Sequence, residues 1–272
     1  MSLYYLPIEQ QLSILEDLYS KAQKALSTRP PGNLTVQRWR NTSQYYYRPA
    51  ADSSRRRYIK KENLYFIKEL AQKEYETSFL RTVLHQKESL YKALSSGTPR
   101  SASLMYHALA LPFERLSKER QALITPYVLP DGLYIRSFLD TVYEKKGFSE
   151  SATVIMTENG ERVRSKSEKI IADKLNSLGI PYLYEYPLYL QRLGWIHPDF
   201  TLLDVRERTT VILEHFGLMQ DLSYVAQAMN KIDSYIFDGY FPGDRLLITY
   251  EGGSHVLNVD TLERLIRHRF SS

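Results

Sequence analysis

The spacing of apolar residues divides the chain into a mostly helical first half and a second half in which helices and strands alternate. Apolar residues recur at helical spacing in residues 7–28 and 61–95, which predicts two amphipathic helices. Between them, residues 34–40 and 44–48 alternate on either side of a short polar turn and predict a β-hairpin. Prolines then separate three shorter predicted helices, at 101–111, 113–124 and 132–145.

The polar segment at 147–164 separates the two patterns. We place a domain boundary there, between a mostly α-helical region with a β-hairpin, residues 1–155, and a second domain, residues 156–272. The second domain is expected to contain, in order, a helix at 168–178, strands at 182–190, 195–203 and 210–216, a helix at 222–237, a strand at 245–250 and a helix at 259–270. This αβββαβα order assigns the domain to the α/β class.

Two of these predicted strands each carry one acid in an otherwise apolar run, Asp199 and Glu214. A carboxylate among apolar residues is costly unless it has a partner. The charged turn 204–208 favours antiparallel pairing of the two strands, which would bring both carboxylates to one ion. Mg²⁺ and Mn²⁺ prefer such oxygen ligands. The sequence therefore predicts a metal site, with Glu168 as a third acid from the preceding helix; for each acid alone, a solvated strand edge is the alternative.

The motifs that contain these acids resemble a known superfamily. Four motifs occur in order between residues 160 and 255, namely Ser165-Lys166-Ser167-Glu168, Tyr184-Glu185-Tyr186-Pro187-Leu188, His197-Pro198-Asp199-Phe200-Thr201 and Glu214-His215-Phe216-Gly217. They resemble a bacterial branch of the PD-(D/E)xK restriction-endonuclease-like nucleases. The resemblance implies an αβββαβ core and a Mg²⁺-dependent phosphodiesterase site with Glu168, Asp199 and Glu214 as its acids. It also implies endo- or exonuclease action with DNA as the favoured substrate. Many related nucleases form homodimers, which makes a homodimer one option for this chain, and the oligomeric state stays open.

The chain departs from the superfamily pattern at one position. The lysine expected two residues after Glu214 is replaced by Phe216. Lysine migration to the next helix is known in the superfamily, so the resemblance points to Lys231 as the substitute; the alternative is an ordinary solvated lysine. Tyr235 lies four residues further on and therefore on the same helical face. We interpret His215 as a packing residue and the acid of the Tyr-Glu-Tyr motif as an exposed strand residue.

Basic and aromatic residues are concentrated between positions 36 and 61. Arginine and lysine contact phosphates and aromatic rings stack on exposed bases, so this composition predicts a nucleic-acid-binding hairpin. The candidate residues are Arg38, Arg40, Tyr46, Arg48, Arg55, Arg56, Arg57 and Lys60. The alternative is a solvated hairpin whose tyrosines pack on the long helix. A formal charge of +5 and a pI near 9.1 favour a polyanionic partner.

Composition excludes several other functions. The absence of cysteine excludes disulfides, thiolate zinc sites and cysteine nucleophiles. No apolar run has the length of a membrane span and no signal peptide is recognisable, so we expect a cytoplasmic protein without a membrane partner. The favoured function is a Mg²⁺-dependent nuclease. A catalytically inactive nucleic-acid-binding protein with a nuclease fold is the first alternative, and a protein-interaction factor that uses the 61–95 helix is the second.

Overall fold

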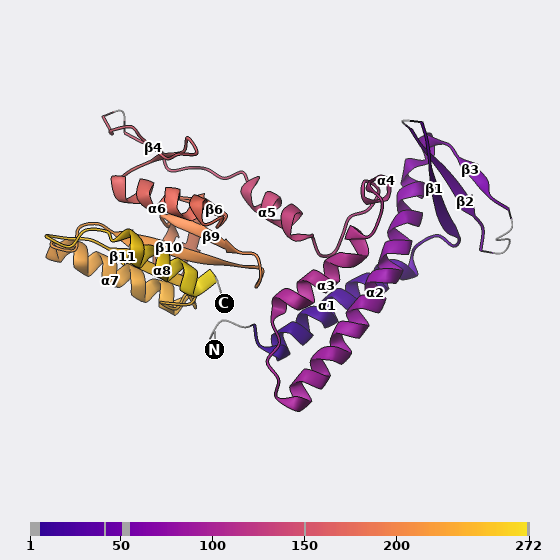
Figure 1. The fold of residues 1–272 in the computed structure, drawn as a ribbon, viewed down its shortest axis with the longest axis horizontal. Coiled ribbons are helices and arrows are strands. Elements are labelled where there is room, and N and C mark those ends of the chain that lie inside the picture. The colour runs from indigo at the N-terminus through magenta and orange to yellow at the C-terminus, as the bar shows by residue number, and fades with distance from the viewer. Residues whose placement is uncertain (1–5, 41, 51–54, 150, 271–272) are drawn as a thin grey trace. The chain divides into compact units, whose positions relative to one another are not determined.

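A computed structural model describes residues 6–40, 42–50, 55–149 and 151–270 (Figure 1). The chain forms two compact units, an N-terminal unit that ends at Tyr134 and a C-terminal unit that begins at Ile135. This division precedes the polar segment at which the sequence analysis places the domain boundary. The predicted mixed α/β class is confirmed. None of the described helices has both the length and the apolar character needed to cross a membrane.

The N-terminal unit consists of helices and one three-stranded antiparallel sheet of order β1-β2-β3. Its elements are α1 (Ile8–Ser27), β1 (Asn33–Trp39), β2 (Thr42–Arg48), β3 (Arg57–Ile59), η1 (Lys61–Asn63), α2 (Leu64–Ser96), α3 (Ala102–Glu114), α4 (Lys118–Gln121) and the first residues of α5 (Asp131–Leu139). Buried apolar side chains of α1, α2 and α3 form its core with Leu34 and Ile59 of the sheet. The predicted hairpin is therefore present, and β3 adds a strand that the sequence analysis did not expect.

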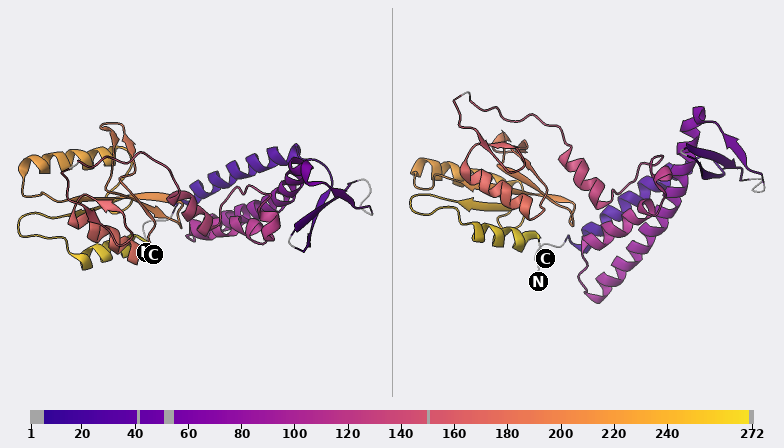
Figure 2. Two further views of the ribbon diagram at one scale, coloured as in Figure 1. Left: turned by 90° about the horizontal axis from the view of Figure 1, so that it is seen from above. Right: turned by 45° about the horizontal axis from the view of Figure 1, so that its top comes forward.

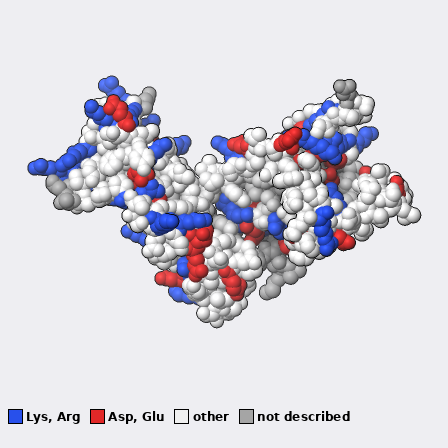
Figure 3. Space-filling model, turned by 180° about the vertical axis from the view of Figure 1, so that it is seen from behind, with Lys and Arg blue, Asp and Glu red and all other residues white. Residues whose placement is uncertain are grey.

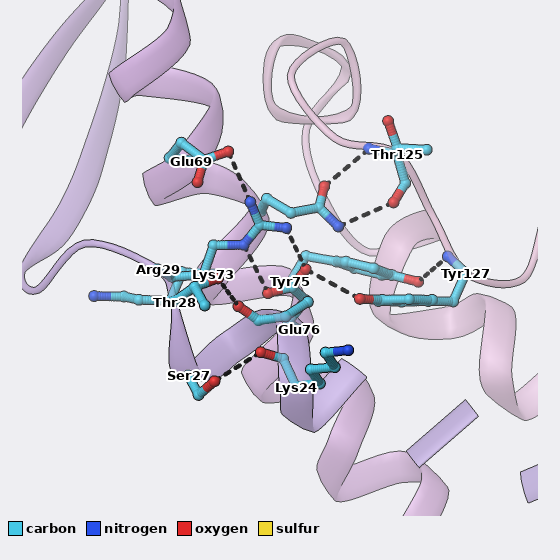
Figure 4. A network of polar contacts seen from close by, with 12 residues as sticks. Lys24, Ser27, Thr28, Arg29, Glu69, Lys73, Tyr75, Glu76, Thr125 and Tyr127 are labelled. Atoms are coloured by element: carbon cyan, nitrogen blue, oxygen red, sulfur yellow. Dashed lines mark hydrogen bonds and ion pairs between the residues drawn. The ribbon is translucent and has the colours of Figure 1, made fainter. Parts of the chain in front are cut away.

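A buried ion pair fixes the end of α1 to α2 (Figure 4). Glu76 of α2 is fully buried, and its carboxylate lies 2.7 Å from Nη2 of Arg29. Arg29 Nη1 also contacts Glu69 at 2.7 Å, and the hydroxyl of Tyr127 donates to Glu76 at 3.2 Å. Because the buried charge has several donors, its desolvation is offset. The network holds two distant chain segments against the long helix.

The C-terminal unit contains a four-stranded sheet of order β11-β10-β9-β6. Its elements are β4 (Ile155–Met156), β5 (Arg162–Val163), α6 (Lys166–Ser177), β6 (Tyr182–Tyr184), β7 (Leu188–Leu190), β8 (Gly194–Ile196), β9 (Phe200–Asp204), β10 (Thr209–Phe216), α7 (Leu222–Phe237), β11 (Leu246–Tyr250) and α8 (Val259–Phe270). Strand β9 runs antiparallel to β6 and β10, while β11 runs parallel to β10. Helix α7 covers one face of the sheet, and α6 and α8 cover the other (Figure 2, left view).

The two long strands predicted at 182–190 and 195–203 are each broken in two. The first is interrupted at Glu185, whose φ of 52° is incompatible with an extended strand. The second is interrupted at Pro198, which has no N–H to donate to a sheet. The pieces pair differently: β6 pairs with β9 in the main sheet, and β7 pairs with β8 as a separate hairpin.

Two predicted helices are also shorter than expected. The helix predicted at 132–145 ends at Leu139, where the β-branched residues Thr141 and Val142 follow and disfavour continuation. The helix predicted at 113–124 is reduced to α4, because α3 continues through Pro112 to Glu114. The residues after α5 instead lie against the C-terminal sheet, where the hydroxyl of Tyr143 donates to the Tyr184 carbonyl at 2.8 Å.

Candidate active site

Asp199 and Glu214 lie opposite one another at one end of the sheet. The β9–β10 register pairs Phe200 with Leu213, and one further step places Asp199 opposite Glu214. Asp199 Oδ2 accepts a 2.7 Å hydrogen bond from the backbone N–H of His215. Directly paired residues of antiparallel strands have neighbouring side chains. The structure therefore brings together the two acids that the sequence predicts as metal ligands.

Helix α7 supplies two donors to Glu214. Lys231 Nζ lies 2.7 Å from Glu214 Oε1, and the hydroxyl of Tyr235 donates to the same oxygen at 2.5 Å. The Glu214 side chain is only 2% exposed, while Lys231 is about a quarter exposed. The i and i+4 spacing places both donors on one face of the helix. Lys231 is thus a partner of the buried acid and is not merely a solvated lysine.

Glu168 reaches the same region from the first turn of α6. The helix begins after Ser165, whose hydroxyl accepts a 3.1 Å hydrogen bond from the Glu168 backbone N–H. Glu168 Oε2 in turn accepts from the Tyr184 hydroxyl at 2.6 Å and from the Arg164 backbone N–H at 2.9 Å. Burial and the neighbouring Glu168 carboxylate raise the pKa of Tyr184, so this tyrosine stays a hydrogen-bond donor.

Negative charge exceeds positive charge around Asp199. Burial and the nearby Glu214 carboxylate raise the pKa of Asp199 well above its ordinary value, and Glu168 adds to the rise. Lys231 and the His215 backbone N–H act in the opposite direction but do not cancel it. The residue as a whole is only partly buried. A divalent cation would relieve this repulsion.

The hydrogen-bond pattern of the acids fits metal ligation. Each carboxylate has one oxygen held by protein donors, as described above. The other oxygens, Asp199 Oδ1, Glu214 Oε2 and Glu168 Oε1, accept no hydrogen bond from the described residues. Within the same residues, no three His, Asp or Glu side chains converge as a complete metal-ligand set. Asp199 and Glu214 therefore fit Mg²⁺, which commonly binds one or two carboxylates and keeps several waters.

Three further residues near the acids have structural roles. Phe216, two residues after Glu214, is buried, and the centroid of its ring lies 6.5 Å from that of Tyr224. His215 packs as expected: its Nδ1 lies 3.0 Å from Thr249 Oγ1. The expectation of an exposed Glu185 is wrong, since this residue is buried.

The pairing of Glu185 explains that difference. Arg164 Nε and Nη2 contact its two carboxylate oxygens at 2.7 and 3.0 Å. The left-handed backbone at Glu185 turns its side chain out of the strand alternation toward Arg164. Sequence periodicity assumes regular alternation and could not show this. Tyr235 was identifiable only by its spacing from Lys231.

The hairpin presents part of the predicted nucleic-acid-binding set on one face. Tyr45 and Tyr47 pack against the core, as the structural alternative expects. The residues that alternate with these two tyrosines lie on the other face of the sheet and point away from the core. We call them the basic aromatic face: Trp39, Tyr46, Arg48, Arg56, Tyr58 and Lys60. The rings of Tyr46 and Tyr58 are 5.6 Å apart, and the Arg56 guanidinium lies 4.5 Å from the Tyr46 centroid.

The other predicted basic residues of the hairpin lie outside this face. Arg38, Arg40, Arg55 and Arg57 are exposed, and Arg38 lies 3.8 Å from Glu119. Lys and Arg side chains gather at the hairpin end of the N-terminal unit, on the left of Figure 3. The face therefore combines positive charge with accessible rings, the two features that single-stranded nucleic acid requires.

Comparisons with known proteins add one partial match. No family model matches the chain. An uncharacterized protein of Methanocaldococcus jannaschii is 37% identical over 70 residues, which are 26% of this chain. The match covers only 6% of that protein. No solved structure matches the chain.

Proposed function

We propose that this protein is a Mg²⁺-dependent nuclease that cleaves phosphodiester bonds of nucleic acid, with DNA as the favoured substrate. The observation that carries the proposal is the pair Asp199 and Glu214, each with one oxygen held by the protein and one oxygen free of protein donors, beside the ammonium of Lys231. Metal-assisted phosphodiester hydrolysis requires a hard cation and further positive charge at the phosphate. This constellation offers sites for both.

The residues have distinct proposed roles. Bound Mg²⁺ would polarise the phosphate and lower the pKa of the attacking water. Asp199 and Glu214 would hold the cation. Lys231 would supply positive charge to a phosphate oxygen, in place of the lysine that the superfamily has at position 216. Glu168, held by Tyr184, orients water at the side of the site.

The order of elements around these residues supports the same proposal. Helix α6 is followed by the antiparallel strands β6, β9 and β10, then by α7 and the parallel strand β11. This is the αβββαβ order of the restriction-endonuclease-like core that the motifs resemble. The basic aromatic face of the N-terminal unit provides a separate surface for holding nucleic acid.

Nicking of supercoiled DNA tests the proposal. We expect the purified protein to nick with Mg²⁺ or Mn²⁺ and not with EDTA. Asp199→Asn keeps the side-chain volume but removes the charged ligand, so it should abolish cutting. Lys174→Met is the matched control, because Lys174 pairs with Glu263 away from the acids. Equal cutting by wild-type protein and Asp199→Asn would identify contamination and contradict the proposal.

Phe216 favours one second candidate, a nucleic-acid-binding protein with an inactive nuclease fold. Its aromatic side chain is buried where the superfamily has a catalytic cation. Such a protein would retard DNA in a gel with a strong salt dependence but would not cut it in any divalent metal. The same nicking assay, combined with gel retardation, separates the two candidates.

A further inference from the structure

A cavity of about 560 Å³ lies in the C-terminal unit. Its lining consists of Glu144, Lys145, Lys146, Gly147, Pro187, Trp195 and His197. We infer that this cavity receives an unstacked nucleobase from a single-stranded segment of the substrate. The inference rests on the proposed function and deepens it, because it names single strands, flaps and frayed ends as the substrate class.

One arginine connects the cavity wall to the acids. Arg164 Nη2 donates to the carbonyl oxygens of Lys146 and Gly147, each at 3.1 Å, and the same guanidinium pairs with Glu185. The Glu185 backbone N–H donates to the carbonyl of Asp199 at 3.1 Å. Hydrogen bonds through Arg164 and Glu185 therefore connect the cavity wall to Asp199, the residue before β9.

A second lining residue is close to Asp199 along the chain. His197 lines the cavity and precedes Asp199 by two residues. Two residues of extended chain span at most about 7 Å, so the cavity and the Asp199 backbone are neighbours. A strand whose phosphate lies at Asp199 would have an adjoining nucleotide within reach of this cavity.

The cavity offers an exposed aromatic surface. Trp195 is 69% exposed, and its cross-strand neighbour on β7, Tyr189, is 56% exposed. Their ring centroids are 5.6 Å apart and their planes cross at 71°. Two large rings left in solvent on a short hairpin bury little surface for folding, but they suit stacking of a base.

Charge at the cavity suits a nucleotide. Lys146 is exposed and makes no ion pair with the described residues, so it is available to a phosphate. Lys145 lies 3.3 Å from Glu161, and Glu144 is the acidic lining residue. Bases inside a duplex have both ring faces covered by their neighbours, so they cannot stack on Trp195. Only an unpaired base can stack on Trp195 while its phosphate contacts Lys146.

The chain allows a direct fluorescence test, because Trp39 and Trp195 are its two tryptophans. In a Trp39→Phe background, Trp195 is the only tryptophan, and excitation at the red edge of its absorption leaves the tyrosines unexcited. In EDTA, we expect a short single-stranded oligothymidine to quench this emission, and a blunt duplex of equal length to leave it unchanged. Quenching by the duplex to the same degree, or no quenching by the single strand, would overturn the inference.

Affinity provides the second measurement. Trp195→Leu should weaken binding of the single strand at least about fivefold, the lower end of base–aromatic stacking, and should leave duplex binding unchanged. Phe241→Leu is the matched control. Phe241 is also an exposed aromatic residue, but it lies before the first residue of β11, Leu246, and does not line the cavity. An unchanged single-strand affinity in Trp195→Leu would also overturn the inference.

Cleavage in Mn²⁺ keeps this inference separable from the proposed function. Quenching of Trp195 by single strands without any cleavage would support the base site and contradict the nuclease. Cleavage without selective quenching would support the nuclease and contradict the base site.

Discussion

The hydroxyl of Tyr235 donates a 2.5 Å hydrogen bond to Oε1 of Glu214, an acid that is buried in the sheet. Burial and the Glu214 charge raise the pKa of Tyr235, so this hydroxyl remains protonated at physiological pH. Lys231 contacts the same oxygen. The two donors on α7 leave Oε2 as the oxygen of Glu214 that is free for a ligand. Tyr235 is therefore a positioning residue for the proposed metal site.

Tyr235→Phe should weaken both the fold and the metal site. Loss of a hydrogen bond to a buried charged acceptor is expected to lower the free energy of unfolding by about 1.5–3 kcal/mol. Urea unfolding measures this change, and calorimetry with Mn²⁺ should show a reduced affinity. Tyr240→Phe is the control, because the Tyr240 hydroxyl makes no hydrogen bond to the described residues although its ring contacts Tyr235. Equal effects of the two substitutions would contradict this role.

Asp199→Asn should stabilise the metal-free protein at neutral pH. The pKa of Asp199 is raised above its ordinary value of 3.8 by burial and by Glu214, so the folded state binds a proton more tightly than the unfolded state. Stability contributed by this group is therefore present at low pH and is lost as pH rises through the raised pKa. The difference between mutant and wild type should be largest at pH 7 and should shrink toward pH 4.

Added metal should reverse that order. Mg²⁺ binds the charged form of Asp199, so it should raise the unfolding midpoint of the wild type and leave that of Asp199→Asn unchanged. Unfolding curves with and without Mg²⁺ at pH 7 provide the measurement. A wild-type midpoint that does not respond to saturating Mg²⁺ is inconsistent with a site at this residue.

Lys231→Met should abolish most activity and destabilise the protein. The substitution leaves the buried Glu214 carboxylate with Tyr235 as its remaining side-chain donor, and we expect a loss of about 1–3 kcal/mol in unfolding free energy. The cleavage rate should fall about 10²- to 10³-fold, as for removal of one charge-stabilising group at a phosphate. Gel-based nicking rates measure the second effect. Retention of full activity would show that the lysine has no catalytic role.

The basic aromatic face should make salt-dependent contacts. Replacing Arg48, Arg56 and Lys60 together by serine should lower nucleic-acid affinity and reduce the slope of log affinity against log salt by about 0.7 for each lost contact with a single strand. Fluorescence anisotropy at several salt concentrations measures this slope. Lys21→Ser is the control, since Lys21 pairs with Asp17 on α1. An unchanged slope in the triple variant would show that the basic aromatic face does not contact the nucleic acid.

Periodicity predicted the bounds of some elements. Helix α7 begins at Leu222 and ends at Phe237 as predicted, and the Asp221 side chain caps its first turn. The broken strands could not be predicted in the same way. Their breaks depend on a positive φ at Glu185 and on the pairing of β7 with β8, which are set by tertiary contacts.

The candidate site was predictable to a similar extent. The strand pattern placed Asp199 and Glu214 together, the superfamily resemblance added Lys231, and the structure brings the three together. Most donors that hold the acids, Glu168 included, were not predictable, because they are backbone groups and a tyrosine hydroxyl of another strand. The His215 backbone N–H and the Tyr184 hydroxyl are examples. Their roles depend on distances and directions that the sequence does not encode locally.

A crystal of the protein soaked in Mn²⁺ tests the central claim most directly. The account predicts an anomalous difference peak about 2.0–2.2 Å from Asp199 Oδ1 and Glu214 Oε2, with water completing the coordination. Asp199→Asn crystals soaked identically should lack the peak. If saturating Mn²⁺ leaves no peak between these oxygens in the wild type, the two acids do not share a cation and the proposed hydrolytic site is wrong.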